Sequence, residues 1–341
     1  MTKTFYAKNK IFFSFKIKDS FKDFLLSLSI LMIMAIIIFN PKFFSSGTIS
    51  GLKLFFFSVF PGLFPFMFLT KVLTNVGFVF KVSNKLSPVS RKLFGTNGLG
   101  FYGFFMSILS GYPIGAQIIG DLYSRNLISQ KEAKKMSLFC TTSGPIFVIG
   151  AVGSAMLGEF KLGVIIYISH TLSSLLLGVI SNIFDKSETV LTPQITTAKK
   201  ESGIFSKCLN ETINSILIVG GYITIFYLIS ELLCSLKVFS FLTKLLAPLM
   251  LKLGFSANET QGILYGIVEI TRGCKELSNE FSLKIIPIIS GLISFSGVSI
   301  IMQSLAFLKE TKIKMHTFVF GKVVHSILSI LVCQLLVIVA F

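Results

Sequence analysis

Charged residues are scarce in this 341-residue sequence: they make up 14% of it, and tryptophan is absent altogether. Soluble globular domains carry roughly 25% charged residues, so the composition excludes an ordinary soluble fold. Apolar residues fill the chain instead, at 52%, and the mean hydropathy is +0.80. This composition indicates a polytopic membrane protein.

Residues that bind metals or perform covalent chemistry are also few. The chain has 3 histidines and 5 cysteines, and the cysteines form neither a CxxC pair nor another metal-ligand spacing. The sequence contains no HExxH, Walker A, GxSxG or dinucleotide-binding motif. We therefore expect no disulfide framework, no metal site, no cofactor and no enzymatic activity.

Acidic residues number only 15 against 32 basic ones, which gives a net charge of +17. A nucleic-acid binder gathers such charge on one face or stripe, whereas these basic residues fall between apolar runs. Positive charge concentrates in the short cytoplasmic loops of membrane proteins. The charge pattern thus predicts a lipid bilayer as partner and no nucleic acid, and it leaves a homo-oligomer open.

The apolar runs predict the membrane spans. A basic stretch at 1–23 precedes the first run, 24–39, and no small-residue cleavage site follows it, which indicates an uncleaved first span. About 20 apolar residues are needed to cross the bilayer core as a helix. Further spans or part-spans are expected at 54–80, 99–119, 136–158, 161–183, 211–236, 260–273, 285–306 and 317–341.

Two of these segments do not read as simple spans. Gly111-Tyr112-Pro113 divides 99–119 into two short pieces, and 260–273 is too short and too polar to cross. We interpret both as re-entrant hairpins. With the N-terminus inside, this topology places most of the 32 basic residues in cytoplasmic loops.

Residues 120–136 join the first hairpin to the next span. Ser129 and Glu132 form a capping box, which predicts a short interfacial helix with its basic face toward solvent or headgroups. For His170 and His325, which lie in apolar spans without a partner at ligand spacing, we expect packing or a local hydrogen bond.

An internal repeat accompanies the two hairpins. KLSPVSRKLFG at 85–95 is similar to LLAPLMLKLGF at 245–255. Each is followed by a broken apolar segment and then by TTSGP at 141–145 in one half or SFSGVS at 294–299 in the other. Three crossings separate corresponding points, so the halves face opposite ways. We predict an all-α membrane fold of two inverted repeats, each with a re-entrant hairpin and broken helices. The expected divisions are the N-terminus and first span at 1–49, repeat 1 at 50–184, a cytoplasmic linker at 185–210 and repeat 2 at 211–341.

Broken helices point to a binding site. Non-helical backbone at membrane depth persists only inside protein or beside a water-filled cavity, and half-helix ends there can meet substrates. The alternative is that these small residues only let helices pack closely. The candidate substrate-binding residues are Ser110, Gly111, Tyr112, Gln117, Thr141, Thr142, Ser143, Gly144, Thr271, Arg272, Ser296, Gly297 and Ser299.

Glu269 is a carboxylate within an apolar stretch, where it is costly unless paired or wetted. Two interpretations stay open. Arg272, three residues on, neutralises it as a structural ion pair, or Arg272 meets an anionic substrate while Glu269 takes up a coupling ion or proton.

Three motifs carry a family resemblance: LSGYPIGAQIIGDLYSRNLISQKEA at 109–133, FCTTSGPIFVIGAVG at 139–153 and GIVEITRG at 266–273. The chain resembles the YlbJ family of sporulation integral membrane proteins, also called SpoVV, over about residues 50–340. The resemblance implies a nucleoside-recognition Gate domain and a fold similar to concentrative nucleoside transporters. It also implies an endospore-forming bacterium, the outer forespore membrane as location, and dipicolinic acid as transported substrate.

These inferences favour an alternating-access carrier of a small organic anion. A nucleoside carrier remains a variant of this reading, because hydroxyl groups and an aromatic ring also suit a nucleoside. A non-transporting membrane scaffold is the alternative from another class. A carrier requires polar groups of both halves to converge on one cavity, whereas a scaffold has these sites packed shut.

The topology is testable with single cysteines at positions 85 and 125 in a cysteine-free background. Lys85 precedes the first hairpin and Arg125 follows it, so a hairpin that re-enters leaves both on the cytoplasmic side. Both cysteines should react with a membrane-impermeant maleimide from that side only. Labelling from opposite sides would contradict the re-entrant hairpin and the inverted repeat.

Overall fold

The computed structural model describes residues 21, 23–185, 203–280 and 282–341. Every regular element in these ranges is a helix, so the predicted all-α class is confirmed there. The basic stretch at 1–23 and the linker at 185–210 lie largely outside the described residues. The chain divides into two compact units, Met1–Ile49 and Ser50–Phe341.

The first unit contains the helix Asp23–Phe39, which matches the predicted first span at 24–39. Most of its large apolar side chains are exposed, as a helix facing lipid requires. After Asn40 the chain continues as helix α2 (Pro41–Leu54), which enters the second unit.

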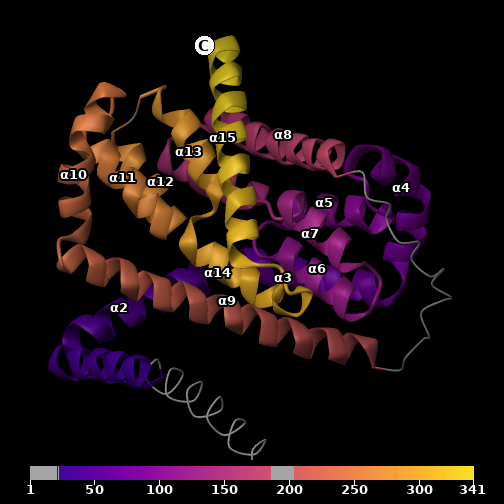
Figure 1. Ribbon diagram of the computed structural model, residues 1–341, viewed down its shortest axis with the longest axis horizontal. Helices are drawn as coiled ribbons and strands as arrows, with labels where there is room; N and C mark the ends of the chain where they lie inside the picture. The colour runs from indigo at the N-terminus through magenta and orange to yellow at the C-terminus, as the bar shows by residue number, and fades with distance from the viewer. Residues whose placement is uncertain (1–20, 22, 186–202, 281) are drawn as a thin grey trace, which may run out of the picture. The chain divides into compact units, whose positions relative to one another are not determined.

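The second unit contains two successive series of helices (Figure 1). We call them the first half and the second half. The first half runs η1 (Phe55–Val59), α3 (Phe60–Asn75), α4 (Phe78–Phe94), α5 (Gly98–Ser110), α6 (Ile114–Ser124), α7 (Gln130–Phe139), η2 (Ile146–Met156) and α8 (Phe160–Phe184). The second half runs α9 (Ile204–Ser235), α10 (Val238–Lys252), α11 (Ala257–Val268), α12 (Ile270–Asn279), α13 (Ile285–Phe295), α14 (Gly297–Phe307), η3 (Lys309–Thr311) and α15 (Met315–Ala340).

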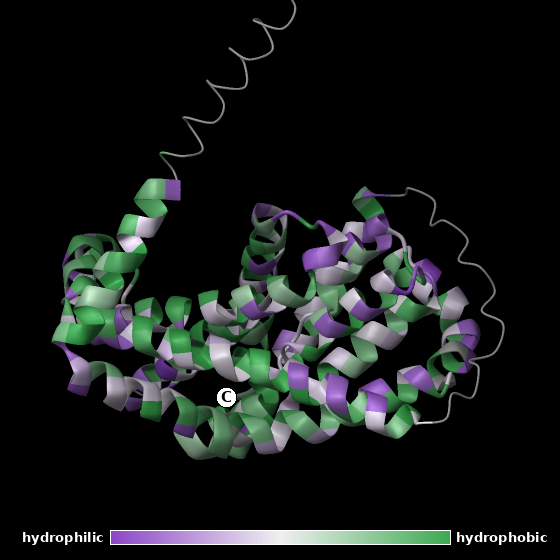
Figure 2. Ribbon diagram, turned by 90° about the horizontal axis from the view of Figure 1, so that it is seen from below, coloured by the Kyte–Doolittle hydropathy of each residue, from purple (hydrophilic) through white to green (hydrophobic). Residues whose placement is uncertain are grey.

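Among the described residues of this unit, four stretches are long and apolar enough to cross a membrane: α8, α9, α13 with α14, and α15. They coincide with the spans predicted at 161–183, 211–236, 285–306 and 317–341. Figure 2 shows hydrophobic residues along most of the helical ribbon, and many large apolar side chains of α9 and α15 are exposed. Such surfaces need lipid around them, and the chain is an integral membrane protein.

Other predicted spans prove to be divided. The segment 54–80 is not one helix, because Gly77 adopts a left-handed conformation (φ 77°) and ends the α3 region before α4. The segment 136–158 contains the end of α7, a non-helical stretch and the π-helix η2.

The predicted interfacial helix is α7, and its capping box is confirmed: the Ser129 hydroxyl accepts from the Glu132 amide. Lys131 and Lys134 of its basic face are exposed, as predicted, whereas Glu132 and Lys135 are buried where α7 packs against α6 and α8. The interfacial location of α7 stays a prediction.

Helices break in the same order in both halves. Break 1 (111–113) separates α5 from α6, and break 2 (141–144) separates α7 from η2. Break 3 at Glu269 separates α11 from α12, and break 4 at Ser296 separates α13 from α14. The predicted interruption at Gly111-Tyr112-Pro113 is thus confirmed. The inverted orientation of the halves stays a prediction.

Helices α11 and α12 form a tight antiparallel hairpin around break 3. A Cβ atom on Gly273 would lie 2.2 Å from the Gly266 Cα, and one on Gly262 would lie 3.0 Å from the Leu277 side chain. In each pair, the two residues lie almost equally far along the sequence on either side of break 3, as in a hairpin. Its entry into the membrane from one side stays a prediction.

Within each half the two breaks touch. A Cβ atom on Gly111 would lie 2.5 Å from the Gly144 amide nitrogen, which brings breaks 1 and 2 together. A Cβ atom on Gly297 would lie 3.4 Å from the Ile270 amide nitrogen, which brings breaks 3 and 4 together. In Figure 1, α10–α13 lie on one side of α15 and α4–α7 on the other.

The hairpin contact generates a stability prediction. Gly273→Ala should lower the free energy of unfolding by about 1–3 kcal/mol, because the new methyl group meets the backbone of Gly266. Thermal unfolding of the detergent-solubilised protein measures this effect.

Gly221→Ala in α9 is the matched control, since its Cβ would have no neighbour within 4 Å. It should stabilise the protein by up to about 1 kcal/mol, as alanine does in helices. Equal unfolding temperatures for both variants would contradict the hairpin packing.

Candidate functional site

A cavity of about 260 Å³ lies where the halves meet. It is lined by residues at breaks 1, 2 and 3 and by α14, directly after break 4. The predicted site residues that line it are Ser110, Gly111, Tyr112, Ser143, Gly144, Glu269, Thr271 and Ser299. Polar groups from both halves therefore converge on one space.

Most of the remaining cavity wall is apolar. Leu63, Phe147, Val219, Ile223 and Ile300 contribute to it. Ligand pockets in general measure about 300–1,000 Å³ and combine apolar walls with a few placed polar groups. The cavity, at about 260 Å³, is slightly smaller than this range, which suits a ligand built on a single ring.

Glu269 lines the cavity and caps helix α12. Its Oε1 accepts from the Thr271 amide at 3.1 Å and its Oε2 from the Arg272 amide at 2.8 Å. A helix N-terminus stabilises a negative charge. The carboxylate is thus held by backbone N–H groups, which are no longer available to a substrate.

Arg272 does not line the cavity. Its Nη1 lies 2.7 Å from Glu231 Oε1 on α9, and its guanidinium lies 4.4 Å from the centre of the Tyr265 ring. The ion pair suggested between Arg272 and Glu269 is therefore wrong, because Arg272 pairs with Glu231 instead. Only the backbone of Arg272 meets Glu269.

Several other candidate residues support the breaks rather than face the cavity. The Thr142 hydroxyl lies 2.6 Å from that of Ser107 in α5, and the Thr141 hydroxyl donates to Ser137 O. The Ser296 hydroxyl donates to Phe295 O, and Ser296 and Gly297 both have positive φ angles, 74° and 70°. These residues shape the backbone of breaks 2 and 4.

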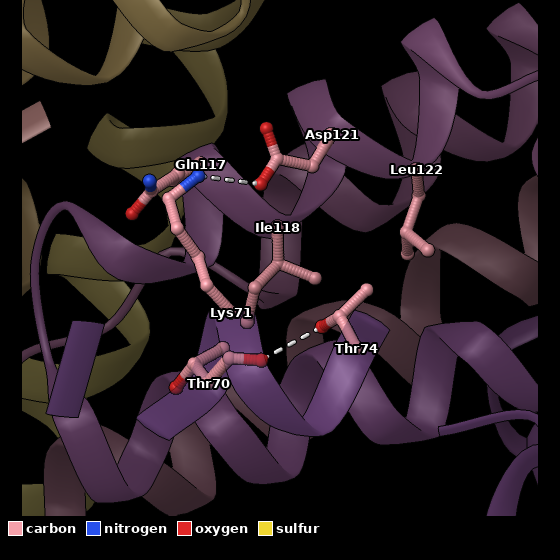
Figure 3. Close-up of a pocket in the computed structure, with 7 residues that line it drawn as sticks. All are labelled: Thr70, Lys71, Thr74, Gln117, Ile118, Asp121 and Leu122. Atoms are coloured by element: carbon pink, nitrogen blue, oxygen red, sulfur yellow. Dashed lines mark hydrogen bonds and ion pairs between the residues drawn. The ribbon is translucent and has the colours of Figure 1, made fainter. Parts of the chain in front are cut away.

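Gln117 lies in a separate polar cluster, which Figure 3 shows. Lys71 on α3 lies 3.2 Å from Asp121 on α6 and 3.4 Å from Glu211 on α9. Gln117 Nε2 donates to Ser215 on α9. The space there is about 10 Å³, which is room for one water molecule. The cluster connects three helices.

His170 on α8 connects the two halves. Its Nε2 accepts from the Ser143 amide at 2.8 Å, and its Nδ1 lies 2.7 Å from the Ser294 hydroxyl. A backbone N–H can only donate, so Nε2 is unprotonated, and in the neutral ring the proton is on Nδ1. His325 stacks on this ring with centroids 4.8 Å apart. The expected hydrogen bonding is confirmed, but it reaches across the molecule rather than being local.

Sequence reasoning missed Lys322 on α15, whose exposed fraction is 2%. Its Nζ donates to the Tyr112 hydroxyl at 3.0 Å and to the Thr141 carbonyl, and lies 4.5 Å from the centre of the Tyr112 ring. A lysine inside an apolar run is a signal that could have drawn attention to it.

Gln303 was also missed. It lines the cavity, and its Nε2 donates to the Ser299 hydroxyl at 3.2 Å. Its spacing of four residues from Ser299 on one helix was the available signal.

Comparisons with known proteins agree with this architecture. The Gate family model, described as nucleoside recognition, matches residues 56–162. The chain is 26% identical over 329 residues to the sporulation integral membrane protein YlbJ of Bacillus subtilis (strain 168), an alignment of 90% of this chain and 80% of that protein. The predicted resemblance to YlbJ is confirmed. No solved structure matches significantly, so the likeness to concentrative nucleoside transporters stays a prediction.

The similarity to YlbJ extends well beyond the Gate match. The matched Gate region contains the cavity residues of breaks 1 and 2, whereas Glu269, Thr271 and Ser299 lie outside it. The second half of the chain therefore supplies part of the cavity wall, and the Gate region alone does not form it.

The placement of Arg272 makes a prediction. Arg272→Gln should lower the free energy of unfolding by about 1 kcal/mol, because it leaves the half-buried Glu231 unpaired. A double variant with Glu231→Gln should recover most of this loss, as measured by thermal unfolding.

Ligand binding by the double variant should match that of the wild type, since neither side chain lines the cavity. A folded double variant that no longer binds an anionic ligand would indicate instead that Arg272 contacts the ligand.

Proposed function

We propose that this chain is a carrier of a small organic anion, with dipicolinate as the first candidate. The observation that carries the proposal is the convergence of helix breaks from both halves on one cavity. Transporters built from repeats form their substrate sites from discontinuous helices in this way. A scaffold has no need of such a cavity.

The cavity chemistry suits a small aromatic carboxylate. Apolar walls accept the ring, and the Tyr112 ring offers a face for stacking. Ser110, Ser143 and Ser299 line the same space, and serine hydroxyls can donate to carboxylate oxygens. Helix η2 starts beside Gly144, where the first turn leaves N–H groups without partners in the helix.

The similarity to YlbJ supports a role in endospore formation. We propose the outer forespore membrane as the location. In an alternating-access cycle the breaks act as hinges, and the cavity opens to one side at a time. Glu269 is the candidate site for a coupling ion or proton, because a change in its charge alters the cap of α12.

A nucleoside carrier is the second candidate, and the Gate match is the observation that favours it. A nucleoside would use the same hydroxyl groups and aromatic ring without needing a positive charge. Direct comparison of dipicolinate with uridine separates the two.

The test is uptake of labelled dipicolinate and uridine into proteoliposomes. Ser299→Ala removes one cavity hydroxyl and should raise KM for the transported ligand about fivefold, the cost of one hydrogen bond. Ser304→Ala on the same helix should leave KM unchanged, because Ser304 is buried but does not line the cavity.

Uptake of uridine alone would favour the nucleoside carrier. Uptake of neither compound above empty liposomes would contradict the carrier and favour the scaffold.

A further inference from the structure

Lys322 is a buried lysine without a carboxylate partner in the described part of the chain. Its exposed fraction is 2%, and none of the carboxylates described lies within ion-pair distance of its Nζ. Lys71, which is also buried, has two carboxylates beside it. Burying an unpaired charge is costly in protein and in membrane, so the position of Lys322 requires an explanation.

The neighbours of Lys322 place its charge beside the cavity. Its ammonium donates to the Tyr112 hydroxyl and lies against the face of the Tyr112 ring. Tyr112 itself lines the cavity. The Tyr112 side chain therefore lies between the Lys322 Nζ and the cavity.

Tyr112 can transmit the effect of the Lys322 charge to a ligand in the cavity. Its hydroxyl accepts from Lys322 at 3.0 Å, donates to Ile293 O at 3.4 Å, and has the Ser296 side chain as a further polar neighbour. A hydroxyl that accepts from an ammonium becomes a stronger donor. The second partner of Lys322, the Thr141 carbonyl at break 2, fixes the ammonium in this position.

We infer that Lys322 determines the selectivity of the cavity for anions, with a carboxylate of the bound substrate as its counter-ion. The inference rests on the proposed carrier function and adds the residue that would separate a dianion from a neutral solute. A hydroxyl-lined cavity alone does not make that distinction.

The experiment compares two ligands of the same shape. Dipicolinate carries two carboxylates, and pyridine-2,6-dicarboxamide carries two neutral amides on the same ring. The Kd of each is measured by thermal-shift titration of the solubilised full-length protein, and dipicolinate uptake is measured in proteoliposomes. The selectivity ratio is the Kd of the diamide divided by the Kd of the dianion.

Lys322→Gln should lower the selectivity ratio by about tenfold or more, since a unit charge near a carboxylate in protein surroundings has an effect of that order. Lys322→Arg keeps the charge and should keep most of the ratio. Lys161→Gln is the matched control: it removes one positive charge from an exposed site and should leave the ratio unchanged.

A folded Lys322→Gln variant with the wild-type ratio would overturn the inference. Equal weakening of both ligands would do the same, because it indicates a purely structural role. If Lys322→Gln does not fold, Tyr112→Phe decides: it removes the hydroxyl that accepts from Lys322 and faces the ligand, so the selectivity ratio should fall. An unchanged ratio in Tyr112→Phe would contradict the inference.

The two proposals fail in different ways. Wild-type protein that binds dipicolinate without transporting it contradicts the carrier, while the loss of selectivity in Lys322→Gln still supports the role of Lys322. Wild-type protein that transports uridine and binds both test ligands equally overturns the role of Lys322 and retains a carrier. Binding of none of these compounds overturns both.

Discussion

The hydrogen bonds of His170 are the interaction on which the arrangement of the two halves depends. In lipid an unpaired backbone amide costs several kcal/mol, so a broken helix persists only where another group satisfies its backbone. His170 accepts from the Ser143 amide at break 2 and pairs with Ser294 beside break 4. One ring thus satisfies a break in the first half and attaches it to the second. His325 packs on that ring and pairs with the His170 carbonyl.

The local features of the fold could be predicted because they depend on local chemistry. Glycine and proline at 111–113 disfavour a continuous helix, and the Ser129–Glu132 capping box starts α7 where the spacing indicates. The long apolar runs become α8, α9 and α15. The interruption at Gly77 was missed, because an isolated glycine in an apolar run is also compatible with a helix.

The candidate site was predicted less completely, because its partners are distant in sequence. Sequence spacing leaves Arg272 as either a partner of Glu269 or a substrate contact, whereas the structure pairs it with Glu231 on another helix. Gln117 faces Ser215 rather than the cavity for the same reason. Lys322 could be recognised as unusual within its span, but only the fold shows that it lies beneath Tyr112.

The glycine contacts at the breaks have a mechanical consequence. Gly111 meets Gly144, and Gly266 meets Gly273, backbone against backbone. Interdigitated side chains lock packed helices, because they must change rotamers before the helices can slide. Contacts between glycine backbones involve no side chains that must change rotamer. The backbone segments that meet at these glycines can therefore shift against one another without changes of rotamer, while His170 and its partners hold the two halves together.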